Sequence, residues 1–276
     1  RKKMDRLKQL KNQYCQGLHQ KDKQLFFLVA MPRSGNTLFS TIMNQNPKIA
    51  STANSITLEI IKDLHLLKKT DVFQNFPDHS SLDNVLNSVY DTYYKDWSQE
   101  IIIDRGPVMT TGNFELMQKH YKRPFKCIVI VRDLMDVLAS YIKWFENEPT
   151  AFVNRFANTI EGKLSEIMNS KGAVAKDLEA IKNAYNYPDI CKFIKYDDLV
   201  SKPEQCINEV YKFLNIPYFE HQFTNLQQIN INGIPYDDTI IGNNMHKIKT
   251  EVKKEYNPYI EKIPQRIKEK YGHIRF

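Results

Sequence analysis

A short apolar run that ends in a basic, hydroxyl-bearing turn is the part of this chain best suited to chemistry. The run is Leu25–Ala30, and the turn and helix start that follow are Arg33, Ser34, Gly35, Asn36, Thr37 and Leu38. Such a run is typical of a strand buried on both faces of a parallel sheet. Backbone N–H groups, the positive end of a helix dipole, a guanidinium and hydroxyls would then meet at one point. The stretch predicts an anion site built from a strand, a phosphate loop and a helix.

Polar side chains also follow three other apolar runs. The runs are Ile101–Asp104, Phe125–Val131 and Ile190–Lys195, and the residues directly after them are Arg105, Arg132 and Tyr196. Because ligands bind beyond the carboxyl ends of parallel strands, these side chains are expected beside the loop. Ser140 lies in the helix after Arg132, from which it can reach the same phosphate. An ordinary turn with an exposed arginine, or a surface Arg–Asp pair, is the alternative at each point taken singly.

Strand-like runs alternate with segments of helical periodicity along most of the chain. Besides the helix after the loop, helices are expected at Ile56–Lys68, Leu82–Trp97 and Asn113–Tyr121, after Asp133, over 150–186, from Pro203 and at Tyr259–Tyr271. The segment Ile49–Ser55, rich in Ser, Thr and Asn, is expected to line the mouth of the pocket, and Phe73–Ser80 is expected to be a loop. Alternation of this kind gives parallel strands joined by right-handed crossovers. It predicts an α/β fold with three layers, α/β/α, around a central parallel sheet, as in P-loop NTPases.

No linker or internal repeat divides the chain, so residues 1–276 are predicted to form a single domain. Residues 1–24 are basic and carry apolar residues at helical spacing, which predicts a basic N-terminal helix. Residues 25–250 are expected to form the core of the domain, and residues 251–276 to end in a C-terminal helix.

Charge and cysteine usage bear on the partners and the compartment. The net charge of +7 suits an anionic ligand such as a nucleotide, a nucleic acid or an acidic surface. The cysteines Cys15, Cys127, Cys191 and Cys206 have no C-x-x-C spacing, which favours free thiols in a reducing compartment over disulfides or zinc. No apolar run approaches the ~18 residues of a membrane span. A cytoplasmic protein without stable membrane insertion is therefore predicted.

Taken in order, these segments resemble the sulfotransferase family over most of residues 25–250. Pro32–Leu38 is similar to the 5′-phosphosulfate loop of tyrosylprotein sulfotransferases and their bacterial and phage relatives, with Asn36 where that form has its first threonine. Val131–Asp133 together with Ser140 is similar to the family's 3′-phosphate motif.

Three further segments extend the resemblance. Lys195–Val200, with Phe213–Pro217 after it, resembles the Y-E-D-L and F-L-G-I-P signature, whose tyrosine contacts the adenosine end of the donor. Asp104–Pro107 stands at the place of the family's K-x-P element, with Arg105 where the catalytic lysine usually stands. His246–Ile248 resembles the late S-K-I/V segment that folds over the donor.

The resemblance implies an enzyme that transfers a sulfuryl group from 3′-phosphoadenosine 5′-phosphosulfate (PAPS) to a hydroxyl or amine, with 3′-phosphoadenosine 5′-phosphate (PAP) as product and no metal required. It implies that Arg33 neutralises the bridging oxygen as PAP leaves and that Arg105 steadies the transferring group. The donor-binding residues that it implies are Arg33, Ser34, Gly35, Asn36, Thr37, Leu38, Arg132, Ser140, Tyr196 and Lys247. The acceptor is expected to be a small molecule, a glycan or a peptide, and nucleic acid is not expected as a partner.

The group that would deprotonate the acceptor is missing from its usual places. Where tyrosylprotein sulfotransferases carry acidic residues, this chain has Ala53 and Asn54, and where cytosolic sulfotransferases use a histidine it has Gly106. These departures argue against a peptide tyrosine as acceptor. The candidates for the base that remain, in order of preference, are Glu59, His65, Asp104 and His246.

Two other classes of protein compete with a sulfotransferase. A P-loop-like kinase needs a carboxylate for Mg²⁺ and a loop lysine, and neither motif is evident. A non-catalytic nucleotide or anion binder needs basic residues with exposed aromatics on one face. It does not need a second phosphate site, such as the one that Arg132 and Ser140 would form.

Overall fold

The computed structural model describes residues 23–248, 250–253 and 256–276. Residues 1–22 of the predicted basic N-terminal helix lie outside the described residues. Its predicted end is wrong, because Gln24 is already the first residue of strand β1.

Five parallel strands form the central sheet, in the order β2-β3-β1-β4-β5. Their bounds are β1 Gln24–Ala30, β2 Ile49–Ser51, β3 Ile101–Arg105, β4 Cys127–Val131 and β5 Cys191–Lys195. The strand that precedes the loop is therefore the central one, and its two neighbours are the strand that ends at Arg105 and the strand that ends just before Arg132. Strand β2 was not predicted, because its three residues form no longer apolar run, and it is recognised only by its pairing with β3.

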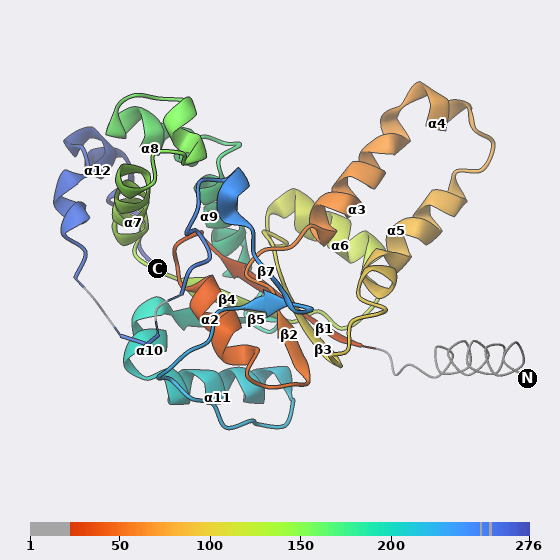
Figure 1. Ribbon diagram of the computed structural model, residues 1–276. Coiled ribbons are helices and arrows are strands. Elements are labelled where there is room, and N and C mark those ends of the chain that lie inside the picture. The colour runs from red at the N-terminus through yellow and green to blue at the C-terminus, as the bar shows by residue number, and fades with distance from the viewer. Residues whose placement is uncertain (1–22, 249, 254–255) are drawn as a thin grey trace, which may run out of the picture.

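Helices cover both faces of this sheet (Figure 1). They are α2 Asn36–Met43, α3 Thr57–Leu66, α4 Asp71–Asn75, α5 Ser80–Tyr93, α6 Thr111–His120, α7 Leu134–Asn147, α8 Ile160–Met168, α9 Ala173–Ala184, α10 Tyr196–Ser201, α11 Pro203–Leu214 and α12 Gln265–Tyr271. Short 3₁₀ turns are η2 Leu67–Lys69, η3 Phe152–Arg155, η4 Asp238–Ile240 and η5 Pro258–Lys262, and β6 Asn230–Ile231 pairs with β7 Ile234–Pro235. The three-layer α/β/α fold predicted from the sequence is confirmed.

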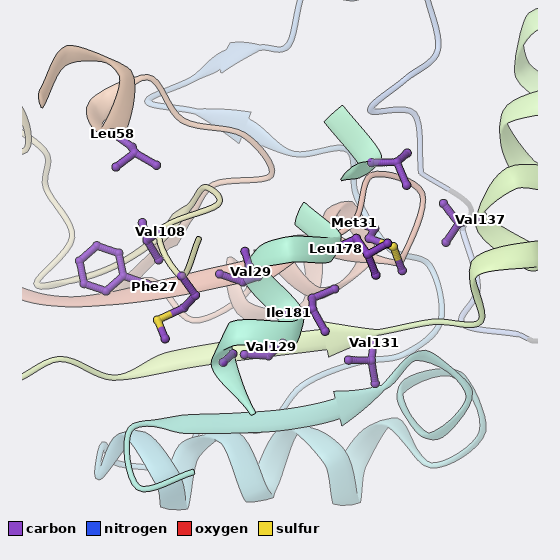
Figure 2. Packing of buried hydrophobic residues seen from close by; sticks show 14 of the residues in the cluster. Phe27, Val29, Met31, Leu58, Val108, Val129, Val131, Val137, Leu178 and Ile181 are labelled. Carbon is purple, nitrogen blue, oxygen red and sulfur yellow. The ribbon is translucent and has the colours of Figure 1, made fainter. Parts of the chain in front are cut away.

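Alternate side chains of β1 enter two separate cores. Phe27 and Val29 pack with helices that include α6, α7 and α9, whereas Phe26 and Leu28 pack with α2 and α11. Figure 2 shows the first of these cores, where Phe27 and Val29 lie in the same layer as Ile181 of α9. Full burial of each such side chain contributes about 1.5–3 kcal/mol, so packing on both faces fixes the position of the central strand.

The start of α7 and the start of α11 follow the sequence prediction. Asp133 caps α7 by accepting hydrogen bonds from the backbone N–H groups of Met135, at 2.8 Å, and Asp136, at 3.4 Å. Pro203 is the first residue of α11, where its missing N–H costs no hydrogen bond.

Three segments differ from the prediction. The expected loop over Phe73–Ser80 is partly wrong, because α4 lies at the end of the arm that α3 and α5 form in Figure 1. The helix expected over 150–186 is wrong at two places: the residues before α8 form only the 3₁₀ turn η3, and α8 is separated from α9 near Gly172, where an added Cβ would lie 2.3 Å from the carbonyl oxygen of Ile167. The C-terminal helix begins only after Pro264, whose ring separates it from η5.

Cys127 and Cys191 lie opposite each other in β4 and β5 as buried free thiols, and Cys206 is also free. The cytoplasmic location inferred from the cysteines stays a prediction. Among the described residues, no helix combines the length and the apolar character needed to cross a bilayer.

Candidate active site

The loop between β1 and α2 is shaped by a tight fit against Tyr196. Gly35 has φ +94°, in the left-handed region, and a Cβ added to it would lie 2.8 Å from Cδ2 of the Tyr196 ring. In the described part of the chain, no side chain caps the start of α2. The first N–H groups of this helix have no partner within the helix itself, so they are donors for a bound anion.

We expect Gly35→Ala to destabilise the protein by about 1–3 kcal/mol, because alanine must adopt a left-handed backbone and displace Tyr196. The measurement is the free energy of unfolding from a urea titration. Gly112→Ala is the matched control, since a Cβ on Gly112, in α6, meets no atom of the described residues within 4 Å apart from its chain neighbours and the backbone of its own helix. That variant should be neutral or gain up to about 1 kcal/mol; equal effects of the two changes would contradict the tight fit at Gly35.

Side chains from four separate segments meet beside this loop. Arg33 Nε donates to Ser140 Oγ at 3.1 Å, and Arg33 Nη1 donates to the carbonyl oxygen of Met245 at 3.2 Å. Arg132 Nη1 donates to the Arg33 carbonyl oxygen at 2.6 Å, and its guanidinium carbon lies 4.2 Å from the centre of the Tyr196 ring. The fold thus brings together four of the residues that the sequence singled out.

The same cluster has an excess of positive charge and unused donors. Burial lowers the pKa of Arg33, and the neighbouring charge of Arg132 lowers that pKa further. Within the described part of the chain, the buried Ser34 Oγ and Arg132 Nε atoms have no hydrogen-bond partner. A phosphate or sulfate group is chemically suited to this cluster, because it would accept from these donors and balance the two guanidinium charges.

Arg105 at the end of β3 is engaged in the protein interior. Its Nη2 donates to the carbonyl oxygen of Ala30 at 2.8 Å and to the carboxylate of Asp177, in α9, at 2.5 Å. The side chains of Arg105 and Asp177 are 11% and 3% exposed, so the ion pair is buried. Burial, partly offset by Arg105, raises the pKa of Asp177 to about 6. Sequence reasoning missed Asp177 because no motif surrounds it in its helix.

One cavity of about 420 Å³ lies over the loop. Of the residues predicted to bind the donor, those that line it are Arg33, Gly35, Asn36, Thr37, Leu38, Arg132, Ser140, Tyr196 and Lys247, and Arg105 lines it as well. Ser34 is fully buried next to the lining residues. The Asn36 side chain is already hydrogen-bonded within the protein: its Nδ2 donates to the Ala53 carbonyl oxygen at 3.2 Å.

The four candidates for the base differ in whether they line the cavity. Glu59, the first choice, is not among the residues lining it, and its carboxylate pairs with Lys62 Nζ at 2.9 Å on the same helix. The Asp104 carboxylate is enclosed, with the Tyr94 hydroxyl donating to it at 2.6 Å, and burial raises its pKa. His65, in α3 of the arm, packs against His120 at the end of α6. Of the four, the structure brings His246 alone to the cavity.

His246 belongs to a segment that closes one side of the cavity, which we call the cover segment (residues 236–248). Hydrogen bonds hold this segment to the loop after β2 and to α7. The Ala53 N–H donates to the Tyr236 hydroxyl at 3.0 Å, and Trp144 Nε1 donates to the Asn243 carbonyl oxygen at 3.1 Å. Sequence reasoning identified only the end of this segment, because its contacts join residues far apart in the chain.

Comparisons with known proteins agree with this arrangement. Residues 23–262 match the model of the family described as "Sulfotransferase domain". A Caenorhabditis briggsae protein that carries the name protein-tyrosine sulfotransferase is 24% identical over 205 residues, which cover 71% of this chain and 67% of that protein. Nodulation protein H of Rhizobium tropici is 24% identical over 225 residues, which cover 72% of this chain and 78% of that protein.

The fold is also similar to that of a solved sulfotransferase domain from the curacin biosynthetic pathway. The TM-score is 0.50 at 18% identity, with 72% of this chain and 76% of that chain covered. Since the family match spans most of the chain, from β1 to the end of η5, the protein belongs to the sulfotransferase domain family and is a sulfotransferase.

Proposed function

We propose that this sulfotransferase uses PAPS as its donor and transfers the sulfuryl group to a hydroxyl or amine of a small molecule, a glycan or a peptide, releasing PAP. The observation that carries the proposal is the contact between the two phosphate-binding motifs. Arg132 donates a hydrogen bond to the Arg33 carbonyl oxygen, and the Arg33 side chain donates one to Ser140 Oγ. A donor with phosphates at both the 5′ and the 3′ position needs two such motifs side by side.

The roles of the loop and of Arg132 follow from their donors. The N–H groups of the first turn of α2, with the hydroxyls of Ser34 and Thr37, would hold the 5′-phosphosulfate end. Arg132 and Ser140 would bind the 3′-phosphate, and Tyr196, which Arg132 covers, would contact the adenosine. The cover segment, which includes Lys247, would exclude water from the reacting group.

Arg33 and Arg105 would act on the charge that develops during transfer. In a sulfuryl transfer, as in phosphoryl transfer, negative charge is spread over the transferring group and the leaving oxygen, so positioning and fixed cations supply most of the catalysis. Both guanidinium groups line the cavity and are held by protein carbonyl oxygens before any ligand binds. Such preorganised donors need no rearrangement when the charge appears.

A kinase is disfavoured by the position of Asp104, the carboxylate next to the end of β3. Asp104 is fully buried between Thr57 and Tyr94 and is not among the residues lining the cavity. A Mg²⁺ carboxylate of a P-loop enzyme would have to reach the nucleotide phosphates.

The proposed donor is tested by ligand-linked stabilisation, measured by thermal unfolding with PAP or ATP and without Mg²⁺. At a hundredfold excess over its dissociation constant, PAP should add about 2.7 kcal/mol. ATP should add much less at the same concentration, because it lacks the 3′-phosphate. Equal stabilisation by the two nucleotides would rule out PAPS as the specific donor.

Variants of the 3′-phosphate motif provide the control for this experiment. Arg132→Ala should remove most of the difference between PAP and ATP, since a hydrogen bond to a charged group contributes about 1.5–3 kcal/mol. Ser140→Ala should remove less. Binding of adenosine 5′-phosphosulfate, which has no 3′-phosphate, should change little in both variants.

A further inference from the structure

The cover segment brings an imidazole to the place where this chain lacks the acidic residues of its relatives. The N–H groups of Ala53 and Asn54 donate to the Tyr236 hydroxyl at 3.0 and 3.4 Å. The Tyr236 ring stacks on His246, with 4.3 Å between ring centres and 20° between planes. His246 is thus one aromatic ring away from the backbone at Ala53, and like Arg33 and Arg105 it lines the cavity.

Asp238 fixes the orientation of this imidazole. His246 Nδ1 donates to Asp238 Oδ1 at 2.6 Å, and the His246 backbone N–H donates to Oδ2 at 2.8 Å. Both side chains are 12% exposed, so the pair is sheltered from competing water. Because a carboxylate only accepts, Nδ1 carries a proton, and in the neutral imidazole the lone pair is therefore on Nε2.

The backbone on either side of the imidazole is fixed as well. Gln228 Nε2 donates to the His246 carbonyl oxygen at 2.8 Å, and the Ile248 N–H donates to Gln228 Oε1 at 3.3 Å. A general base must be held within hydrogen-bond reach of the proton it removes. The stacking, the carboxylate and the glutamine restrain His246 from three directions.

We propose that His246, positioned by Asp238, is the general base for the acceptor; this assignment rests on the proposed function. The acceptor oxygen or nitrogen forms a bond to sulfur while its proton passes to His246 Nε2. The bond between sulfur and the bridging oxygen breaks, and its electron pair leaves with PAP. The acceptor is sulfated, the imidazolium that results is stabilised by Asp238, and release of its proton to water returns the base.

The central test is the rate of single-turnover transfer from PAPS to a series of alcohols and phenols of increasing acidity. We expect His246→Gln to lower the rate by about 10²–10⁴-fold for weakly acidic acceptors. A phenol that is already ionised at the assay pH needs no base, so its rate should hardly change. PAP affinity should also be unchanged. His273→Gln, an exposed histidine outside the cavity lining, is the matched control and should behave as the unmodified protein.

Three further variants sharpen the test. Asp238→Asn should lower the rate with the same dependence on acceptor acidity, since an amide no longer enforces the Nδ1–H tautomer. In His246→Ala, added free imidazole should restore transfer to weakly acidic acceptors. Glu251→Gln, which changes an acidic residue of the cavity lining, should leave the acidity dependence unchanged.

The outcomes distinguish a wrong assignment of the base from a wrong assignment of the donor reaction. A rate loss in His246→Gln that is equal for all acceptors, or a rate loss in Glu251→Gln that is confined to the weakly acidic acceptors, would overturn the assignment of His246 while the sulfotransferase reaction stands. If the unmodified protein transferred sulfate from PAPS to none of the acceptors, the proposed donor reaction would fail, and the base with it. PAP binding by each variant shows that it is folded.

Discussion

Replacing Arg33 by methionine is expected to lower the single-turnover rate of sulfuryl transfer by roughly 10²–10³-fold, while PAP affinity falls much less. The guanidinium is held in place by Ser140 Oγ and by the Met245 carbonyl oxygen before a donor binds. An interaction that strengthens only as charge develops raises the rate of the chemical step and not the affinity for the ground state. Rate and PAP affinity are therefore measured side by side.

Arg33→Lys should restore part of this rate. Lysine keeps the positive charge but lacks the planar fork that contacts Ser140 and Met245 together. The comparison is free of a backbone effect, because Arg33 has φ +66° and neither methionine nor lysine relieves that conformation. Arg266→Met, on a side chain that is 84% exposed and outside the cavity lining, is the matched control. Equal proportional losses of rate and affinity would mean that Arg33 only holds the donor.

Replacing Asp177 by asparagine is expected to destabilise the protein by about 3–5 kcal/mol, because the Arg105 guanidinium would stay buried without its carboxylate. The free energy of unfolding from a denaturant titration measures the effect. Asp63→Asn is the matched control on the exposed side of α3, where a change within about 0.5 kcal/mol is expected.

A double-mutant cycle identifies the cause of this loss. In Arg105→Met with Asp177→Asn, the unpaired buried charge is gone, so the double variant should lose less stability than the sum of the single losses. Additive losses would show that the two side chains are not coupled. The cycle also gives the stability of Arg105→Met, and therefore its unfolded fraction. Any loss of rate in this variant must be corrected for that fraction before it is attributed to catalysis.

Several features of the fold were determined by local sequence. An apolar run of strand length, a proline and a glycine that allows a left-handed turn specify the β1–loop–α2 unit through interactions within a few residues. Parallel strands then necessarily end at one edge, so the side chains after β1, β3, β4 and β5 meet there. For this reason Arg33, Arg132 and Tyr196 could be placed together from their positions after strands alone.

The tertiary structure alone decided which partners these residues have and which candidate base reaches the cavity. Asp177 reaches Arg105 from α9, and Tyr236 reaches Ala53 from beyond the β6–β7 hairpin. Glu59 is the first candidate from the sequence because it lies a few residues after Ala53 and Asn54, yet in α3 its carboxylate pairs with Lys62. Local patterns specify turns and strands because the energies involved are local. Contacts between residues far apart in sequence depend on how the helices and the cover segment pack over the sheet, and no short motif encodes that packing.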